Sequence, residues 1–319
     1  MAVGGAAFES PSPHATIVAD IWDGKAWSST RPVSPGHSQI TVDSVSCSSS
    51  RDCIAVGYYD YDRTLIERWD GSRWSLQKPA PFAGSSAPLL TGVSCSAASS
   101  CMAVGFYQGR GFTRTVAERW DGTDWSLTKT IDYAHSSRSE LRGVSCSSPS
   151  LCMAVGGGLV ERWNGTKWSL QPNSSHQLDL NGVSCTSRTW CMAVGSYGPL
   201  ARAYAQRWNG QRWSPLRARS PSNSIAVFKG VSCSAQNRCT AVGQATNRQT
   251  DTGTPLIERW NGTRSTVIHA QNYDTRPHPH TPRPSTAPLP ERSRTATAMQ
   301  VAPMHTLGSE RRGSVLGTV

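Results

Sequence analysis

The chain has 319 residues and a formal net charge of +11, from 32 Lys and Arg against 21 Asp and Glu. The basic residues are scattered singly, so the charge indicates a solvated surface and argues against a nucleic-acid-binding patch. No uninterrupted apolar run of 18 residues occurs, so no transmembrane helix is predicted.

One motif is repeated along the chain. Its clearest copy, residues 143–169, reads GVSCSSPSLCMAVGGGLVERWNGTKWS. In each full copy a V-S-C step is followed six positions later by a second Cys, which leads into A-V-G. An E-R-W step with the first Trp comes next, followed by Asp-Gly or Asn-Gly and then by a second Trp. Self-similarity of this kind is typical of folds built from one supersecondary unit per repeat. The leading tryptophans are Trp22, Trp69, Trp120, Trp163, Trp208 and Trp260, at intervals of 43 to 52 residues.

Each full copy predicts four short strands. The first ends at V-S-C, the second runs from the second Cys through A-V-G, the third ends at E-R-W, and the fourth starts at W-S. Asp-Gly or Asn-Gly between the third and fourth strands predicts a tight hairpin, because both residues tolerate positive φ. The Ser-rich loop between the two cysteines predicts a second hairpin. No sustained apolar period of 3.6 residues occurs, which argues against helices.

In chain order the motif defines six units and a tail. Residues 1–28 form a partial unit, because Met1-Ala2-Val3-Gly4 matches the A-V-G step and no V-S-C strand precedes it. We therefore expect that the start codon is assigned too late, that a secretion signal lies upstream, and that a weak seam separates the first and last units. Residues 264–319, rich in Pro and without Cys or Trp, are predicted to be a disordered tail or a frameshift product. The five fuller units are residues 29–75, 76–126, 127–169, 170–214 and 215–263.

Four strands per unit, repeated radially, predict an all-β fold, a β-propeller of about six four-stranded blades with the first one incomplete. The small apolar strand ending in Gly, the next strand, the Asp-Gly or Asn-Gly turn and the Trp five positions on resemble a kelch-type propeller blade. The full GVSC…CMAVG…ERWNGTxWS pattern resembles the Cys-paired repeat proteins of secreted bacterial propellers. The resemblance covers residues 1 to about 265 and implies the propeller fold, but it says little about function.

All ten cysteines fall in five C-x5-C pairs. Two cysteines that flank a hairpin loop face each other across adjacent strands, within reach of a disulfide bond. Zinc sites favour closer spacing and no His recurs with the pairs, so disulfides are predicted and metal is not. Five disulfides imply an oxidising compartment, and we expect an extracellular or cell-surface protein. The predicted pairs are Cys47 with Cys53, Cys95 with Cys101, Cys146 with Cys152, Cys185 with Cys191, and Cys233 with Cys239.

The strand order places the connections on two faces. The loops between cysteines and the Asp-Gly or Asn-Gly turns share one face and are nearly constant in length. The connections after A-V-G and after W-S share the other face, called here the variable-loop face, and their lengths differ. Variable loops on a rigid scaffold carry function in repeat folds, so this face is the predicted binding surface. The candidate ligand-binding residues are Tyr58, Tyr59, Tyr61, Phe106, Tyr107, Arg110, Phe112, Arg114, Tyr133, Tyr197, Arg202 and Tyr204.

Some recurrent residues also fit a structural role. Tyr59, Tyr107 and Tyr197 each follow the A-V-G glycine by two positions, which also fits packing along a strand. The Glu-Arg pairs before the leading Trp recur in nearly every unit, whereas a catalytic centre usually occurs once. Adjacent residues on a strand point to opposite faces, so we expect these pairs and the Trp pairs to pack between blades.

No catalytic motif appears: G-x-S-x-G, H-E-x-x-H, P-loop and dinucleotide-binding patterns are all absent. We therefore predict a secreted or cell-surface, non-enzymatic propeller, monomeric and without cofactor or metal, that binds a protein or glycan. One alternative is a propeller enzyme (a hydrolase, lyase or kelch-type oxidase) with its site at the central channel. Two or more carboxylates or histidines at the channel mouth would favour that alternative. The other is a truncated gene product without activity of its own.

Overall fold

The computed structural model describes residues 2–6, 16–35, 39–84, 86–132, 138–173, 177–262 and 264–268. Within these ranges the regular elements are all β-strands, β1 to β23, as the sequence predicts. A helix long and apolar enough to cross a membrane is not found in the described ranges. Most of the predicted tail, residues 269–319, lies outside the described residues.

Each repeat forms one antiparallel sheet whose strands follow the chain order. The first sheet has three strands, β1 (Ala2–Ala6), β2 (Thr16–Trp22) and β3 (Trp27–Thr30). The second is β4 (Ile40–Ser49), β5 (Asp52–Tyr59), β6 (Arg63–Trp69) and β7 (Trp74–Leu76). The third is β8 (Leu89–Ala97), β9 (Ser100–Gly109), β10 (Phe112–Trp120) and β11 (Trp125–Thr128).

The remaining three sheets repeat this four-stranded order. The fourth is β12 (Gly143–Ser148), β13 (Leu151–Gly156), β14 (Leu159–Trp163) and β15 (Trp168–Leu170). The fifth is β16 (Leu178–Ser187), β17 (Trp190–Tyr197), β18 (Arg202–Trp208) and β19 (Trp213–Leu216). The sixth is β20 (Ser224–Ala235), β21 (Arg238–Asn247), β22 (Gly253–Trp260) and β23 (Ser265–Ile268).

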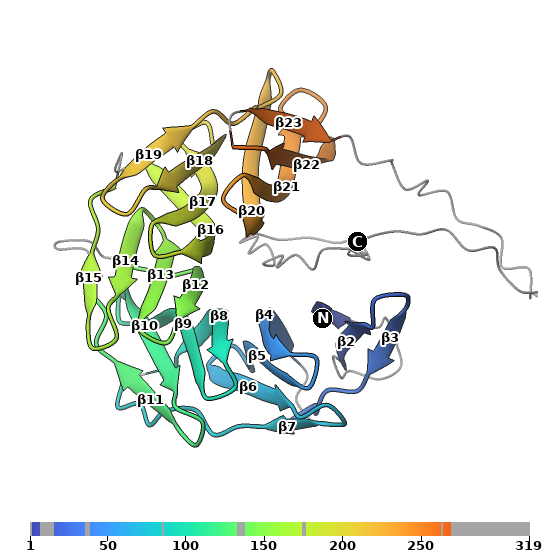
Figure 1. The fold of residues 1–319 in the computed structure, drawn as a ribbon, viewed down its shortest axis with the longest axis vertical. Coiled ribbons are helices and arrows are strands. Elements are labelled where there is room, and N and C mark those ends of the chain that lie inside the picture. The colour runs from blue at the N-terminus through green and yellow to red at the C-terminus, as the bar shows by residue number, and fades with distance from the viewer. Residues whose placement is uncertain are drawn as a thin grey trace, which may run out of the picture.

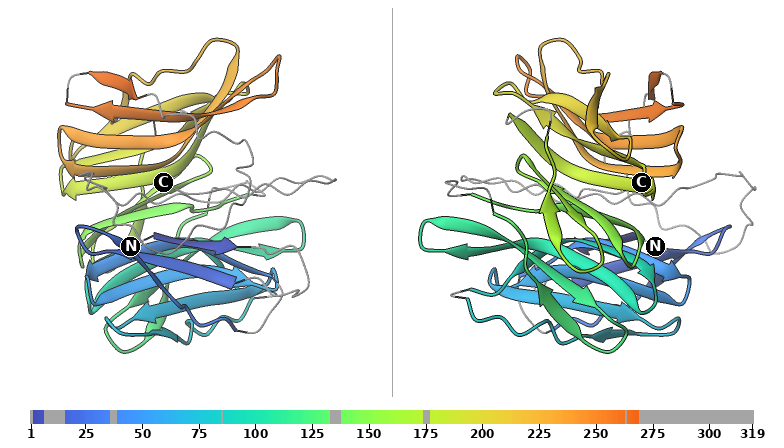
Figure 2. Two further views of the ribbon diagram at one scale, coloured as in Figure 1. Left: turned by 90° about the vertical axis from the view of Figure 1, so that its right-hand side faces the viewer. Right: turned by 60° about the vertical axis from the view of Figure 1, so that its left-hand side comes forward.

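The six sheets follow one another around a central axis, with the first strand of each full sheet innermost (Figure 1). Neighbouring sheets pack through their broad faces (Figure 2). This arrangement is a β-propeller, as predicted, and the sheets are its blades one to six. Blade one lacks an innermost V-S-C strand, also as predicted. The arc that the described residues form stays open between blade six and blade one (Figure 1).

Packing between blades explains most of the constant residues of the repeat. The leading and trailing Trp of a blade lie opposite each other across the hairpin, as Trp69 and Trp74 do, with ring centroids 5.7 Å apart. In blades two to five each pair packs against the preceding blade, here in one apolar cluster with Ile17 and Ala19. Where Thr is available the trailing Trp also donates to it, as Trp74 Nε1 does to Thr30 Oγ1 at 2.9 Å. The prediction that the Trp pairs pack between blades is confirmed.

The V-S-C step joins the innermost strands of neighbouring blades. Ser94 Oγ in blade three accepts a hydrogen bond from the backbone N–H of Cys146 in blade four at 2.9 Å. The Gly before V-S-C lets these strands approach, since a Cβ at Gly182 would lie 3.1 Å from the Cα of Gly230 in the next blade. The same Ser-to-Cys contact links Ser46 with Cys95, Ser145 with Cys185, and Ser184 with Cys233.

All five predicted disulfides are formed between directly opposed positions on the first and second strands of a blade. Their Cα atoms lie 3.9 to 4.0 Å apart. The described residues contain no free cysteine. Each disulfide therefore fixes a hairpin at the inner edge of its blade.

The structure differs from the sequence-based expectation at two places. The Asp-Gly and Asn-Gly hairpins are four-residue loops in which only the Gly has positive φ, +96° at Gly71, while the Asp70 side chain accepts the N–H groups of Ser72 and Arg73. The Asp or Asn is thus a side-chain acceptor and does not adopt positive φ itself. The last blade also extends past the boundary set at residue 263, because β23 pairs with β22 through its backbone and needs no trailing Trp.

Candidate functional site

An aromatic cluster on the variable-loop face brings several predicted residues together. The Phe82 ring, from the connection between β7 and β8, lies edge-on to Tyr107 of β9 with centroids 4.9 Å apart. Tyr107 in turn lies edge-on to Phe112 of β10 at 6.4 Å. The Arg114 guanidinium carbon sits 4.7 Å from the centre of the Phe112 ring, in a cation–π contact. These four side chains, Phe82, Tyr107, Phe112 and Arg114, are called here the aromatic–Arg cluster.

The neighbouring connections hold this cluster in place. Asp132, from the connection after β11, forms an ion pair with Arg114 Nε at 3.4 Å and accepts the Thr115 N–H at 2.9 Å. On the other side, Ser86 Oγ donates to the Gln108 carbonyl at 2.6 Å, which attaches the connection before blade three to its β9–β10 hairpin. The Phe112 side chain remains 36% exposed. The cluster is therefore preorganised and accessible.

A second, smaller aromatic pair lies on the same type of hairpin in blade five. Tyr197 and Tyr204 have ring centroids 6.1 Å apart, and Arg202 pairs with Tyr197 across the strands. Tyr197 and Leu200 are exposed, at 41% and 47%. Tyr197, Arg202 and Tyr204, which the sequence predicted as candidates, thus come together.

The other predicted candidates do not form a common site. Tyr58 is buried, at 8% exposed, and burial raises the pKa of its hydroxyl. Tyr59 packs against the core between blades one and two, and Tyr107 also packs against the core between blades two and three, as the structural interpretation expects of both. Tyr61 is 70% exposed in a turn, with φ of +63°. Phe106 is half-buried and Arg110 is exposed beside the aromatic–Arg cluster, whereas Tyr133 lies outside the described residues.

The recurrent Glu of E-R-W is a scaffold residue that connects blades. Glu118 is fully buried in blade three, and its Oε2 accepts the N–H of Ala80, from the connection that leaves blade two, at 2.9 Å. Glu161 accepts the Ile131 N–H in the same way at 3.1 Å. Burial raises the pKa of Glu118 to about 7 and that of Glu161 to about 8. The Glu therefore anchors the incoming connection in these two blades.

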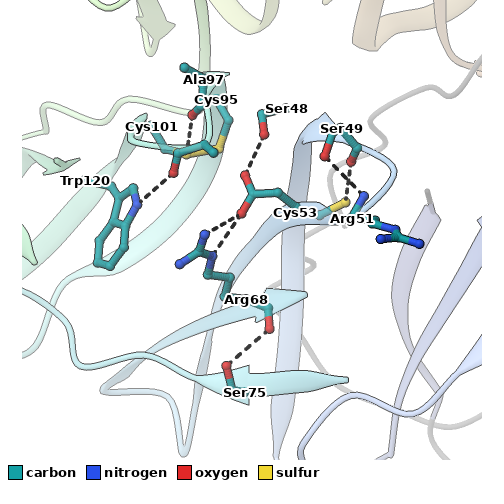
Figure 3. A network of polar contacts seen from close by, with 12 residues as sticks. Ser48, Ser49, Arg51, Cys53, Arg68, Ser75, Cys95, Ala97, Cys101 and Trp120 are labelled. Atoms are coloured by element: carbon teal, nitrogen blue, oxygen red, sulfur yellow. Dashed lines mark hydrogen bonds and ion pairs between the residues drawn. A yellow bond between two sulfur atoms is a disulfide. The ribbon is translucent and has the colours of Figure 1, made fainter. Parts of the chain in front are cut away.

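The Arg of E-R-W points to the opposite face of its strand. Figure 3 shows Arg68, which pairs with Asp52 at 2.8 Å beside the disulfide-bearing hairpin of its own blade. Its guanidinium lies 5.7 Å from the ring of Trp120 in the next blade. In turn, Trp120 donates to the Ala98 carbonyl at 3.1 Å. Glu and Arg thus serve two different inter-blade contacts, as expected from their adjacency on a strand.

A ring of polar residues at the central channel was missed by the sequence analysis. In β4, β8, β16 and β20 the register shifts just before V-S-C, so one residue in each strand is bulged. Together with a residue just ahead of β12, the bulged residues line a cavity between the inner strands. A usable signal was present: the position four before the first Cys is polar and different in each full repeat. These residues are Asp43, Thr91, Arg142, Asn181 and Lys229.

Charges around this cavity are largely paired. Arg142 donates to Asp179, to Asn181 Oδ1 at 3.1 Å and to Glu140 Oε2 at 3.3 Å. Asp43 is the carboxyl among the cavity-lining residues, and burial raises its pKa to about 7. Burial and the nearby Arg142 lower the pKa of Lys229. In the described part of the chain, no three His, Cys, Asp or Glu side chains are placed to hold a metal.

Among the comparisons with known proteins, the likeness to the SapL1 lectin supports the fold. Neither a family model nor a curated protein matches the chain. The SapL1 lectin, solved with alpha methyl fucoside, is similar at a TM-score of 0.50 and 12% identity, over 80% of this chain and 92% of that one. A mutant Aleuria aurantia lectin bound to alpha-methyl-L-fucoside has a TM-score of 0.48 and 10% identity, over 82% of this chain and 92% of the lectin. YCF48 bound to D1 peptide has a TM-score of 0.47 and 11% identity, over 82% of this chain and 88% of YCF48.

Proposed function

We propose that this protein is a secreted or cell-surface, non-enzymatic β-propeller that binds a protein or glycan through its variable-loop face. The aromatic–Arg cluster carries the proposal. Residues needed for stacking the blades recur in most of the full blades, whereas these four side chains are found together in blade three and its incoming connection. Aromatic and Arg side chains are also the types enriched at binding hot spots.

The chemistry of the cluster fits two kinds of ligand. Exposed aromatic edges and faces stack on sugar rings or apolar peptide side chains, and the Arg supplies hydrogen-bond donors to hydroxyl, carbonyl or carboxylate groups. The cluster is fixed by Asp132 and by the Ser86 contact, so little conformational entropy is lost on binding. Tyr197 and Tyr204 in blade five offer a second subsite of similar composition.

A glycan array and a peptide library probed with the full chain would test this function. The glycan array includes alpha-methyl fucosides, because the SapL1 lectin shares the fold. For ligands found, we expect Phe112→Ser to weaken binding by about tenfold or more, as expected for removal of an interface hot spot. Leu127→Ser is the matched control, because Leu127 is similarly exposed, at 42%, on the outer strand of the same blade. Equal binding by wild type and Phe112→Ser, or no binding to either collection, would refute the proposal.

Secretion is the second part of the proposal and rests on the five disulfides. We expect the chain to be recovered from the culture medium of its host with all ten cysteines oxidised. Non-reducing mass spectrometry of peptides containing Cys146 and Cys152 reports the pairing directly. Recovery in the cytosol with free thiols would contradict this part while leaving the binding proposal standing.

One observation favours an enzyme as the second candidate. Asp43 is a buried carboxyl with a pKa near 7 in a cavity that also exposes Lys229, and perturbed groups in cavities are candidate acids or bases. Glu140 and Asp179 nearby are both ion-paired with Arg142. A hydrolase and lyase substrate screen that gives turnover in wild type and none in Asp43→Asn would establish this candidate instead.

A further inference from the structure

The interface between consecutive blades has two halves that differ in composition. The leaving half belongs to the earlier blade and includes the Val of A-V-G and the apolar residue before the Glu of E-R-W. The receiving half belongs to the later blade and contains its two Trp. Both halves are buried at the contact between blades two and three, where Val56 and Ile66 are at most 1% exposed and Trp120 and Trp125 are each 4% exposed.

Blade six presents a leaving half that no described residue covers. At the Val position, Val56, Val104, Val155 and Val194 are each 0% exposed, whereas Val242 of β21 is partly exposed. At the position before the Glu, Ile257 of β22 is likewise partly exposed, and the neighbouring Arg259 is exposed. An apolar face that is buried in blades two to five is thus left open in blade six.

Blade one presents the complementary receiving half, also open. Its trailing tryptophan, Trp27, is 45% exposed, whereas the trailing Trp of blades two to five are 4 to 6% exposed. Val18, on the same face of β2, is 39% exposed. The two open halves border the same opening of the arc (Figure 1).

The polar contacts between blades also stop at this opening. In the other blades the Ser of V-S-C accepts the Cys N–H of the next blade, and Ser232 of blade six has no described V-S-C strand after it. On the blade-one side of the opening, Asp20 occupies the position that the buried Glu of E-R-W has in other blades. Oδ1 of Asp20, like Oε1 of Glu118 and of Glu161, is buried without a hydrogen-bond partner among the described residues. In the two glutamates the other oxygen, Oε2, accepts a backbone N–H from the preceding connection.

We propose that the opening between blades six and one is a docking site for one further repeat unit of this type. Such a unit carries both halves of the interface. Its two Trp cover Val242 and Ile257, its own Val and apolar strand residues cover Val18 and Trp27, and its outgoing connection donates an N–H to Asp20. A second whole copy of this chain fits the opening less well, because its remaining blades would have to enter the space between blades six and one as well.

The probe for this proposal is an oxidised polypeptide of residues 138–177, which holds the strands of blade four, its outgoing connection and the Cys146–Cys152 disulfide. It is titrated into the full chain by calorimetry, and hydrogen–deuterium exchange is followed on both. We expect a saturable 1:1 complex in which peptides covering β1–β3 and β20–β22 become protected. Val18→Asp and Val242→Asp should each weaken the complex by about tenfold or more, because each places a charge in the buried contact.

Leu127→Asp is the control, since Leu127 is exposed on an outer strand away from the opening. Both test positions are already solvent-accessible, so these variants should melt at the temperature of wild type. Absence of binding would overturn the proposal. So would self-association of the chain in sedimentation that Val242→Asp abolishes, because a second copy would then be the occupant. Protection of both faces before the probe is added, together with protection of residues 269–319, would instead make the chain's own tail the occupant.

Discussion

The buried Glu of E-R-W makes a specific prediction about stability and pH. Burial raises the pKa of Glu118 in the folded protein to about 7, against an ordinary value of 4.5. Its folded pKa lies above its unfolded pKa, so the stabilising contribution is fully present below pH 4.5 and is lost as the pH rises toward 7. The difference of about 2.5 units corresponds to roughly 3 kcal/mol at most for this residue, at 1.36 kcal/mol per unit.

Glu118→Gln should remove this dependence while keeping the structural contact, because an amide oxygen still accepts the Ala80 N–H. The chain offers its own precedent in Gln206, fully buried at the same position of blade five. We expect the variant to match wild type near pH 4.5 and to be more stable by up to about 3 kcal/mol at pH 8. Gln206→Glu should produce the reverse change.

Urea unfolding with intact disulfides, at half-unit intervals from pH 4.5 to 8, measures both variants. Glu118→Ala is the control for loss of the anchor, and we expect it to be destabilised at every pH because the Ala80 N–H loses its acceptor. If wild type and Glu118→Gln show the same slope of unfolding free energy against pH, Glu118 is not buried as a neutral acid and the reasoning fails.

Two further predictions concern the inner edge of the blades. Replacing Cys146 and Cys152 together by Ala should lower the free energy of unfolding by on the order of 2 kcal/mol, because the seven-residue loop is no longer closed in the unfolded chain; no change in urea midpoint would contradict this. Ser94→Ala should cost about 1 kcal/mol by removing the acceptor for Cys146 N–H, whereas Ser232→Ala in the last blade should be neutral; equal effects at both positions would show that the serines do not act between blades.

The features that the sequence predicted correctly are those that recur in every full blade. A strand needs its hairpin and its apolar alternation each time, so the positions of Trp69 and Trp74 or of Cys146 and Cys152 define the pairing register directly. The boundary at residue 263 was wrong because it relied on the trailing Trp. At Ser265 the strand is held by backbone pairing with Trp260, which leaves no mark in the side-chain pattern.

The parts that escaped prediction depend on contacts between different connections. Phe82 lies in the incoming connection of blade three, well before β9 in the sequence, yet it packs on Tyr107 of that strand. No local pattern links these two residues. The polar ring at the channel depends on a β-bulge, which shifts Asp43 and Lys229 by one residue from regular alternation. A strict period of two assigns such residues to the wrong side of the strand.

The repeat itself supplies a way to separate scaffold from function. Glu118 and Glu161 have strongly raised pKa values, which in an ordinary enzyme would mark candidate acids. Here a Glu at the equivalent position of each of these two blades accepts a backbone N–H from the incoming connection. A contact between blades therefore accounts for the raised pKa values. The aromatic–Arg cluster and the channel ring behave in the opposite way. Neighbouring blades carry different residues at the positions of Phe112 and Lys229, although β4, β8, β16 and β20 share the backbone bulge at the second of these positions. Stacking the blades does not require a particular side chain at these positions, so selection for a ligand can act on them, and this is the reason for placing the binding surface there.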